Sequence, residues 1–227
     1  MKPLVTLTLL FSLLVTTDAA IKWHDVKDFG IEGRAFDDTE VFYDRLPARA
    51  KKLVRSAVWN LSRDSAGMAV RFTTDAPTIQ ARWELKDAGL AMPHMPATGV
   101  SGLDLYVKGD DGKWRWVANG RPTKYPINTS TLINLIPAAS REYLLYFPLY
   151  NGVKKVEIGI PDTSKITKAP AYPKNKRKPL LFYGTSITHG ACASRPGMTH
   201  SAMLGRRFGR PIVNLGFSGN GRMHKEV

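Results

Sequence analysis

The sequence predicts a β plus α/β fold, in which a jelly-roll-like β-sandwich precedes a parallel β-α-β unit. Before residue 160, short segments with alternating apolar and polar residues recur, as in half-buried strands. After residue 179, two apolar runs flank an amphipathic stretch, which indicates two parallel strands joined by a helix. Because a proline-rich segment separates the two regions, we expect domains at 21–160 and 179–227 and a linker at 161–178.

The first twenty residues have the plan of a secretory signal peptide. Lys2 provides a positive start, residues 4–15 are mostly apolar, and small residues at 17–20 include only one charged side chain. The apolar run is too short to span a bilayer stably. We therefore expect a secreted or periplasmic protein that has no membrane association once residues 1–20 are removed.

The composition fits a globular enzyme. Hydrophobic residues make up 43% and aromatic residues 10% of the 227 positions, which is enough to bury a core. The chain has one cysteine, Cys192, so no intrachain disulfide can form. We interpret Cys192 as a small buried filler rather than a second nucleophile.

The six strand signals between residues 60 and 160 predict a sandwich of jelly-roll type. They lie at 67–73, 78–84, 103–107, 113–117, 143–147 and 153–160. Trp114 and Trp116 fall on one face of a predicted strand, where they either form a platform for sugar rings or pack between the two sheets. We favour packing, because tryptophans at alternating positions are more often part of a core.

The linker and the region after it carry most of the positive charge. The formal net charge is +14, and residues 163–227 contain twelve Lys and Arg but one acid. These cations divide between the linker and the predicted helix, without a helix-turn-helix or a base-stacking motif. We therefore expect no nucleic acid partner.

The prolines of the linker disfavour both a helix and a central strand.

The most specific signal is the segment Gly184–Gly190, which directly follows the apolar run 180–183. It places the hydroxyl of Ser186 at the C-terminal tip of a predicted strand, where open α/β sheets bind ligands. Thr188 stands where the α/β-hydrolase motif G-x-S-x-G has its second glycine, which disfavours that fold. A second strand is predicted at 211–215, with a glycine-rich loop at 216–221 and a crossover helix at 198–208 between the strands.

These two blocks resemble the first two sequence blocks of the SGNH, or GDSL-type, esterase and acylhydrolase superfamily. One position departs from the pattern, because Thr185 stands where Asp is usual. The segment Gly102–Tyr106 also resembles the Gly-x-Asp-Leu-Tyr signature of a β-rich module that precedes SGNH catalytic domains in secreted bacterial hydrolases. The resemblance implies a flavodoxin-like three-layer α/β/α hydrolase domain, of which residues 179–227 are the N-terminal part.

The resemblance also implies roles for two residues. Ser186 would attack an ester carbonyl, and the backbone N–H groups of Ser186 and Gly219 would face the developing oxyanion. This chemistry needs no cofactor and no metal, and no His/Cys/Asp cluster with ligand spacing argues for a metal site.

Two other blocks of the superfamily have no counterpart between Pro179 and Val227. They are the block that supplies an Asn to the oxyanion hole and the Asp-x-x-His block that supplies the base and its orienting acid. We therefore expect the 227 residues to be an incomplete catalytic domain without appreciable esterase activity of their own. We also expect Phe182, Val213 and Leu215 to be left without the later strands that would bury them.

Asn220 and Asp104 are weaker candidates for substrate contacts. Asn220 either points into the oxyanion hole or is a turn residue. Asp104 either orients a substrate or reaches toward the catalytic domain, or it closes a turn by accepting backbone hydrogen bonds. The histidines His189, His200 and His224 are interpreted as polar surface residues rather than as the base.

These observations favour a serine esterase that deacylates a small-molecule or glycan ester, and we expect an acetylated carbohydrate as its substrate. Two alternatives stay open. One is a carbohydrate-binding module attached to an inactive hydrolase remnant, and the other is a structural secreted domain.

Overall fold

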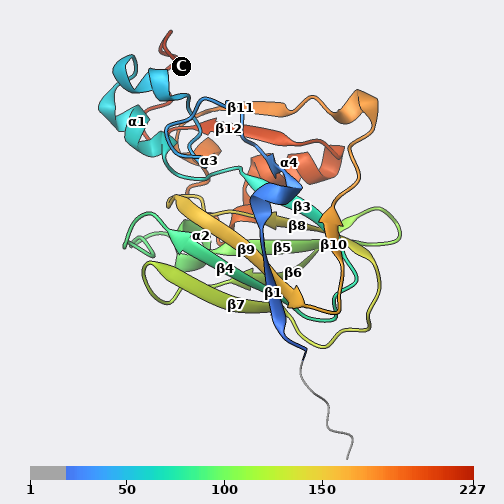
Figure 1. Cartoon of the computed structure of the whole chain (residues 1–227). Coiled ribbons are helices and arrows are strands. Elements are labelled where there is room, and N and C mark those ends of the chain that lie inside the picture. Colours follow the sequence, from blue (N-terminus) through green and yellow to red (C-terminus); the bar gives the residue numbers. More distant parts are fainter. Residues whose placement is uncertain (1–18) are drawn as a thin grey trace, which may run out of the picture.

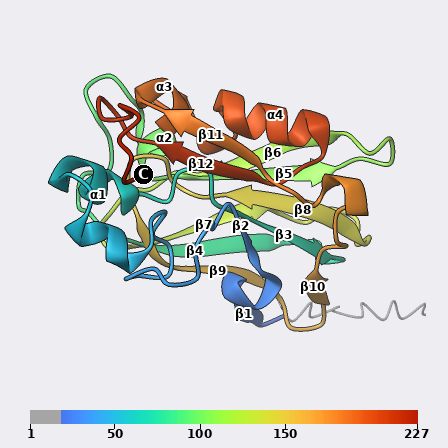
Figure 2. The same cartoon turned by 90° about the horizontal axis from the view of Figure 1, so that it is seen from above.

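The computed structural model describes residues 19–227, so almost all of the predicted signal peptide lies outside the described residues. The described chain forms two antiparallel sheets and a pair of parallel strands (Figures 1 and 2). The predicted β plus α/β fold is therefore confirmed. Within residues 19–227, no helix has the length and apolar character needed to cross a membrane.

Ten strands build the sandwich. The first sheet, sheet A, has the order β1 (Ile21–Asp25), β9 (Val153–Pro161), β4 (Ile79–Leu85) and β7 (Ile127–Ile133). The second, sheet B, has the order β10 (Ile166–Lys168), β3 (Ala69–Thr74), β8 (Arg141–Tyr146), β5 (Leu103–Lys108) and β6 (Trp114–Gly120), with β2 (Ile31–Glu32) also paired to β3.

The main hydrophobic core lies between the two sheets. Along β4, buried and half-buried residues alternate, as the period-2 pattern predicts. Trp83 of β4 is 1% exposed, and its indole N–H donates to the Ser101 carbonyl at 3.0 Å, so its one polar atom is satisfied. Phe72 of β3 stacks on Tyr143 of β8 in the same core, with ring centroids 5.4 Å apart.

Segment 161–178 runs along the edge of sheet B. Its strand β10 contains no proline, pairs with β3 and ends that sheet. Tyr172 then lies 3.7 Å from the guanidinium of Arg71 and donates a hydrogen bond to Glu32. A short 3₁₀ helix, η3 (Lys174–Lys176), leads to the parallel strands.

The parallel strands β11 (Leu180–Gly184) and β12 (Ile212–Gly216) lie above sheet B in Figure 1. Helix α4 (His200–Phe208) lies between these two strands and sheet B. Thr199 caps α4 by accepting from the N–H of Ala202, and Gly209 ends it in the left-handed conformation. Ala202 packs on tyrosines of sheet B. On α4, Gly205 lies against Ile212 of β12. The predicted β-α-β unit is thus present.

A long N-terminal segment covers the other side of β12. Between β2 and β3 it forms η2 (Ala48–Lys52) and α1 (Ser56–Ser62). Val58 and Trp59 of this segment pack against Val213 and Leu215 of β12, which are 7% and 8% exposed. The expectation that Val213 and Leu215 lack a cover is therefore wrong, because the N-terminal domain supplies it. The C-terminus lies beside α1 (Figures 1 and 2).

Trp114 and Trp116 do not pack between the sheets, so that preference is corrected. Both belong to β6 and lie outside the cluster that fills the space between the sheets. Trp114 packs against the cluster beneath α4. Trp116 is 49% exposed, but the guanidinium of Arg195 lies 4.7 Å from its ring centroid. These rings therefore take part in the contact between sheet B and residues 179–227.

Candidate active site

Ser186 is the first residue of the short helix α3 (Ser186–His189), which follows β11 after a single residue. The Ser186 carbonyl accepts hydrogen bonds from the N–H groups of Gly190 and Ala191, at 2.9 and 2.8 Å. Gly190 ends the helix with φ +122°, a conformation that favours glycine. Because N–H groups in the first turn of a helix lack intrahelical partners, the Ser186 N–H is suited to donate a hydrogen bond to an oxygen from outside the helix.

The loop after β12 lies directly beside the Ser186 turn. The N–H of Phe217 donates to the Gly184 carbonyl at 2.9 Å, and the N–H of Met223 donates to the Tyr183 hydroxyl at 2.8 Å. A side chain on Gly221 would clash with the Gly184 backbone, so these two segments are in close contact. Gly219 lies between these anchoring residues.

Gly219 is exposed and has φ +66°. No atom lies within 4 Å of the position that a Cβ on Gly219 would occupy, so there is free space beside its backbone. Asn220 takes part in the turn, because its side-chain amide donates to the Ser218 carbonyl at 2.8 Å and its N–H donates to that of Phe217 at 2.7 Å. These are the contacts that the turn interpretation of Asn220 expects.

A buried asparagine of β12 fixes α3 to the strand. The Asn214 side chain donates to the Thr188 carbonyl at 2.7 Å and accepts from the N–H of Gly216 at 2.8 Å. A Cβ on Gly216 would clash with the backbone of His189, so α3 and β12 cross closely at this glycine. The sequence analysis missed Asn214, although a polar residue inside an apolar strand was a signal.

His189 is fully buried, so its interpretation as a surface residue is wrong. Its Nε2 lies 3.4 Å from a carboxylate oxygen of Asp64 and 3.3 Å from the guanidinium of Arg45. Burial and the charge of Arg45 hold the pKa of His189 well below its usual value. A neutral imidazole with such a low proton affinity is a poor general base.

The other two histidines lie farther along the chain. His200 meets Phe182 edge to face, with ring centroids 5.5 Å apart, and His224 accepts a hydrogen bond from Arg55. Among residues 19–227, no histidine is hydrogen-bonded to the Ser186 side chain.

Cys192 is exposed and has φ +62°, which corrects its interpretation as a buried filler.

Asp104 joins sheet B to the segment that follows α3. It is fully buried, and its carboxylate accepts from the N–H of Gly197 and from the Trp116 indole, both at 2.9 Å. Arg195 lies 3.3 Å from the same carboxylate. Burial raises the pKa of Asp104 to about 6, although these donors oppose the rise. Three roles were considered for Asp104, and the structure shows the one in which its side chain contacts residues 179–227.

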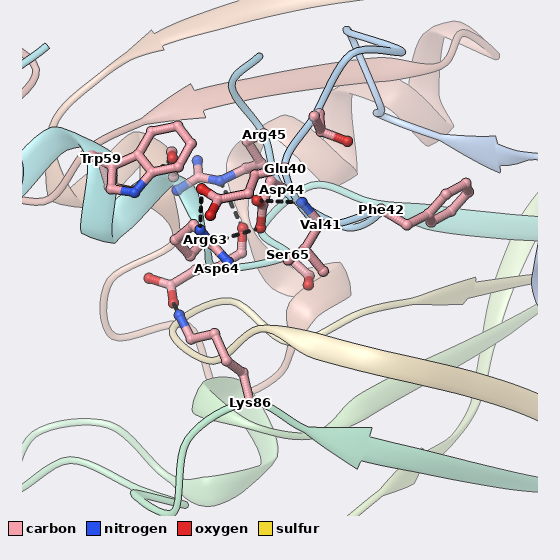
Figure 3. Close-up of polar contacts among 12 residues, drawn as sticks. Glu40, Val41, Phe42, Asp44, Arg45, Trp59, Arg63, Asp64, Ser65 and Lys86 are labelled. Carbon is pink, nitrogen blue, oxygen red and sulfur yellow. Dashed lines mark hydrogen bonds and ion pairs between the residues drawn. The ribbon is translucent and has the colours of Figure 1, made fainter. Parts of the chain in front are cut away.

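The segment that carries Arg45 is held by ion pairs (Figure 3). Arg63 lies 3.0 Å from both Glu40 and Asp44, and Asp44 also accepts from the N–H of Val41. On the other side, Lys86 lies 3.5 Å from Asp64. Burial raises the pKa of Asp64 to about 6. Within the described part of the chain, no group of three or more His, Cys, Asp or Glu side chains could hold a metal ion.

Two family models match the chain. The N-terminal domain of SGNH hydrolase-type esterases, named GxDLY, matches residues 21–166, and the GDSL-like lipase/acylhydrolase family matches residues 177–227. No curated protein matches the chain.

Solved structures give the same result. A GDSL-like lipase from Bacteroides ovatus is 35% identical with a TM-score of 0.83, over 91% of this chain and 59% of that chain. The salicylyl-acyltransferase SsfX3 from a tetracycline biosynthetic pathway is 18% identical with a TM-score of 0.68, over 88% of this chain and 55% of that one. At this identity, the similarity is evidence for a shared fold only. The chain thus spans little more than half the length of these two proteins.

Proposed function

Because the chain belongs to the SGNH-type esterases that carry the GxDLY N-terminal domain, we propose that its complete gene product is a secreted serine esterase acting on acetylated carbohydrate. The observation that carries the proposal is the position of Ser186 at the start of α3, beside the loop that holds Gly219. The sequence of residues 1–20 supports export.

In the proposed reaction, the Ser186 hydroxyl attacks the ester carbonyl and transfers its proton to a base. The N–H groups of Ser186 and Gly219 stabilise the negative charge that develops on the carbonyl oxygen. Collapse of this intermediate expels the alcohol, which takes up the proton, and leaves an acyl group on Ser186. Water then hydrolyses the acyl-enzyme to release the carboxylic acid and regenerate the serine.

His189 does not serve as this base in our proposal. Its ring is buried against Asp64 and Arg45, and its low pKa disfavours uptake of the serine proton. The base is assigned instead to the Asp-x-x-His block of the superfamily, which has no match between Pro179 and Val227. The tests therefore use the complete gene product.

The test compares acetate release from acetylated oligosaccharides with hydrolysis of short- and long-chain p-nitrophenyl esters. We expect the wild-type enzyme to prefer acetyl esters, and Ser186→Ala to lose at least about 10³-fold in kcat. Ser194→Ala is the matched control, because Ser194 is an exposed serine in the loop after α3. Undiminished turnover by Ser186→Ala would overturn the assignment of the nucleophile. Retention on a polysaccharide without turnover would favour a carbohydrate-binding module instead.

A further inference from the structure

Arg45 of the N-terminal domain binds the strand that leads to the Gly219 loop. Its guanidinium is 1% exposed and donates to the carbonyl oxygens of Asn214 and Gly216, at 3.1 and 2.8 Å. It also donates to the carbonyls of Leu61 and Asp64 in its own domain, at 2.6 and 2.9 Å. Burial lowers the pKa of Arg45 to about 10, which still leaves it charged at neutral pH. One planar cation thus ties the two parts of the chain together at the end of β12.

Tyr150, which follows β8 in the same domain, contacts both ends of α3. Its ring stacks on the ring of His189, with centroids 4.1 Å apart and planes 12° apart. Its hydroxyl donates to the carbonyl of Ser186 at 3.3 Å. Burial raises the pKa of Tyr150, so its hydroxyl stays protonated at neutral pH and remains a donor to the Ser186 carbonyl.

His189 connects these two supports. Its ring lies against Tyr150 on one face, and its Nε2 lies within 3.5 Å of both Arg45 and Asp64. Helix α3 has four residues, which is too short to be stable without tertiary contacts. The position of Ser186 therefore depends on the residues that α3 rests on.

We propose that Tyr150 and Arg45 are positioning residues of the esterase, through which the N-terminal domain holds the Ser186 turn and the Gly219 loop in register. The proposal rests on the esterase function proposed above. Its physical basis is that a nucleophile and its oxyanion donors must be held within a fraction of an ångström of the productive geometry. A displacement of about 1 Å can cost about 10²-fold in rate.

The test uses Tyr150→Phe in the complete gene product, because this change removes the hydroxyl and keeps the ring that stacks on His189. We expect kcat for an acetyl ester to fall about 10-fold or more, with KM within about 2-fold and Tm within about 2 °C of wild type. Tyr143→Phe is the matched control, since Tyr143 lies in the core between the sheets. It should leave kcat unchanged.

Amide hydrogen exchange provides a readout that does not depend on turnover. In Tyr150→Phe, the amides of residues 186–191 should exchange at least about 10-fold faster, while those of β4 and β9 keep their rates. Arg45→Lys, which keeps the charge and loses the planar fork, should speed exchange at 214–221. Arg71→Lys, a buried arginine paired with Glu32 and Glu142, is its control.

The outcomes separate the two proposals. Loss of kcat together with faster exchange at 186–191 in Tyr150→Phe supports the positioning role. Wild-type kcat and wild-type exchange in Tyr150→Phe would overturn it. If the wild-type protein hydrolyses no ester, the proposed function fails, and the exchange rates alone still decide whether Tyr150 and Arg45 hold the two loops.

Discussion

At the scale of single residues, the candidate site depends more on backbone groups than on side chains. In the proposed reaction, Ser186 contributes both a hydroxyl and an N–H at the start of α3, while Gly219 contributes an N–H from an open turn. The φ of +66° explains why a glycine suits position 219. A test of this position must therefore separate the loss of the N–H from the strain of a side chain.

Replacing Gly219 by Ala and by Pro tests this position in two steps. Ala is strained at φ +66° but keeps the N–H, and there is free space for its side chain, whereas Pro fixes φ near −65° and both shifts the turn and removes the N–H. Only Pro removes the N–H. We expect Gly219→Pro to lower kcat of the complete gene product about 10²- to 10³-fold, as loss of one oxyanion donor does, and Gly219→Ala to lose far less. Equal losses in the two variants would exclude the Gly219 N–H from the oxyanion hole.

Asp104 predicts a dependence of stability on pH. Since its pKa is raised from 3.8 to about 6, the folded chain holds this proton more tightly than the unfolded chain. The resulting stabilisation is present below about pH 4 and is lost as the pH rises through about 6. The free energy of unfolding of wild type relative to Asp104→Asn should fall by about 2 kcal/mol between pH 4 and pH 7 in urea titrations. A difference that grows with pH would show that the three donors dominate instead.

At the scale of elements, α3 is held at the point where it crosses β12. Gly216 permits this approach because it has no side chain, and Asn214 fixes it with two hydrogen bonds. We expect Gly216→Ala to destabilise the chain by about 1 to 3 kcal/mol through overpacking, measured by urea unfolding. Gly89→Ala is the control, because no atom lies within 4 Å of the Cβ it would add. Equal stability of the two variants would mean that the crossing can relax.

The elements that the sequence analysis found are those with a strong local pattern. Strands β4 and β5 and both parallel strands lie within one or two residues of their predicted positions. It missed β7, in which four polar residues, Asn, Thr, Ser and Thr, follow the first isoleucine before Leu and Ile end the strand. Apolar and polar residues therefore hardly alternate in β7. It also missed β10, which has three residues and forms only because the edge of β3 is available. Such elements are set by tertiary pairing rather than by propensity.

At the scale of the whole molecule, the sandwich and the parallel β-α-β unit pack against each other. Leu46 and Trp59 cover β12, Ala202 of α4 packs on sheet B, and Arg45 and Asp104 bind backbone groups of residues 179–227. These contacts join residues separated by 56 to 171 positions, so no local pattern could reveal them. The sequence predicted the position of Ser186 and of the glycine-rich loop, but it did not reveal Arg45, Asp64, Tyr150 or Asn214.

This packing predicts cooperative unfolding of residues 19–227. Far-ultraviolet circular dichroism and tryptophan fluorescence should report one coincident transition in urea. Residues 19–178 alone should fold but be less stable, because their contacts to β12 and α4 are lost. Two separate transitions in the longer chain would show that the domains are independent.

The central claim, that Ser186 is the nucleophile of an SGNH-type esterase, is tested most directly by covalent labelling. A fluorophosphonate is added to the complete gene product, and the modified peptide is identified by mass spectrometry. We expect a single adduct on Ser186, abolished in Ser186→Ala and retained in Ser194→Ala, because an activated serine attacks phosphorus and displaces fluoride. An adduct on another serine, or labelling that persists in Ser186→Ala, would contradict the account.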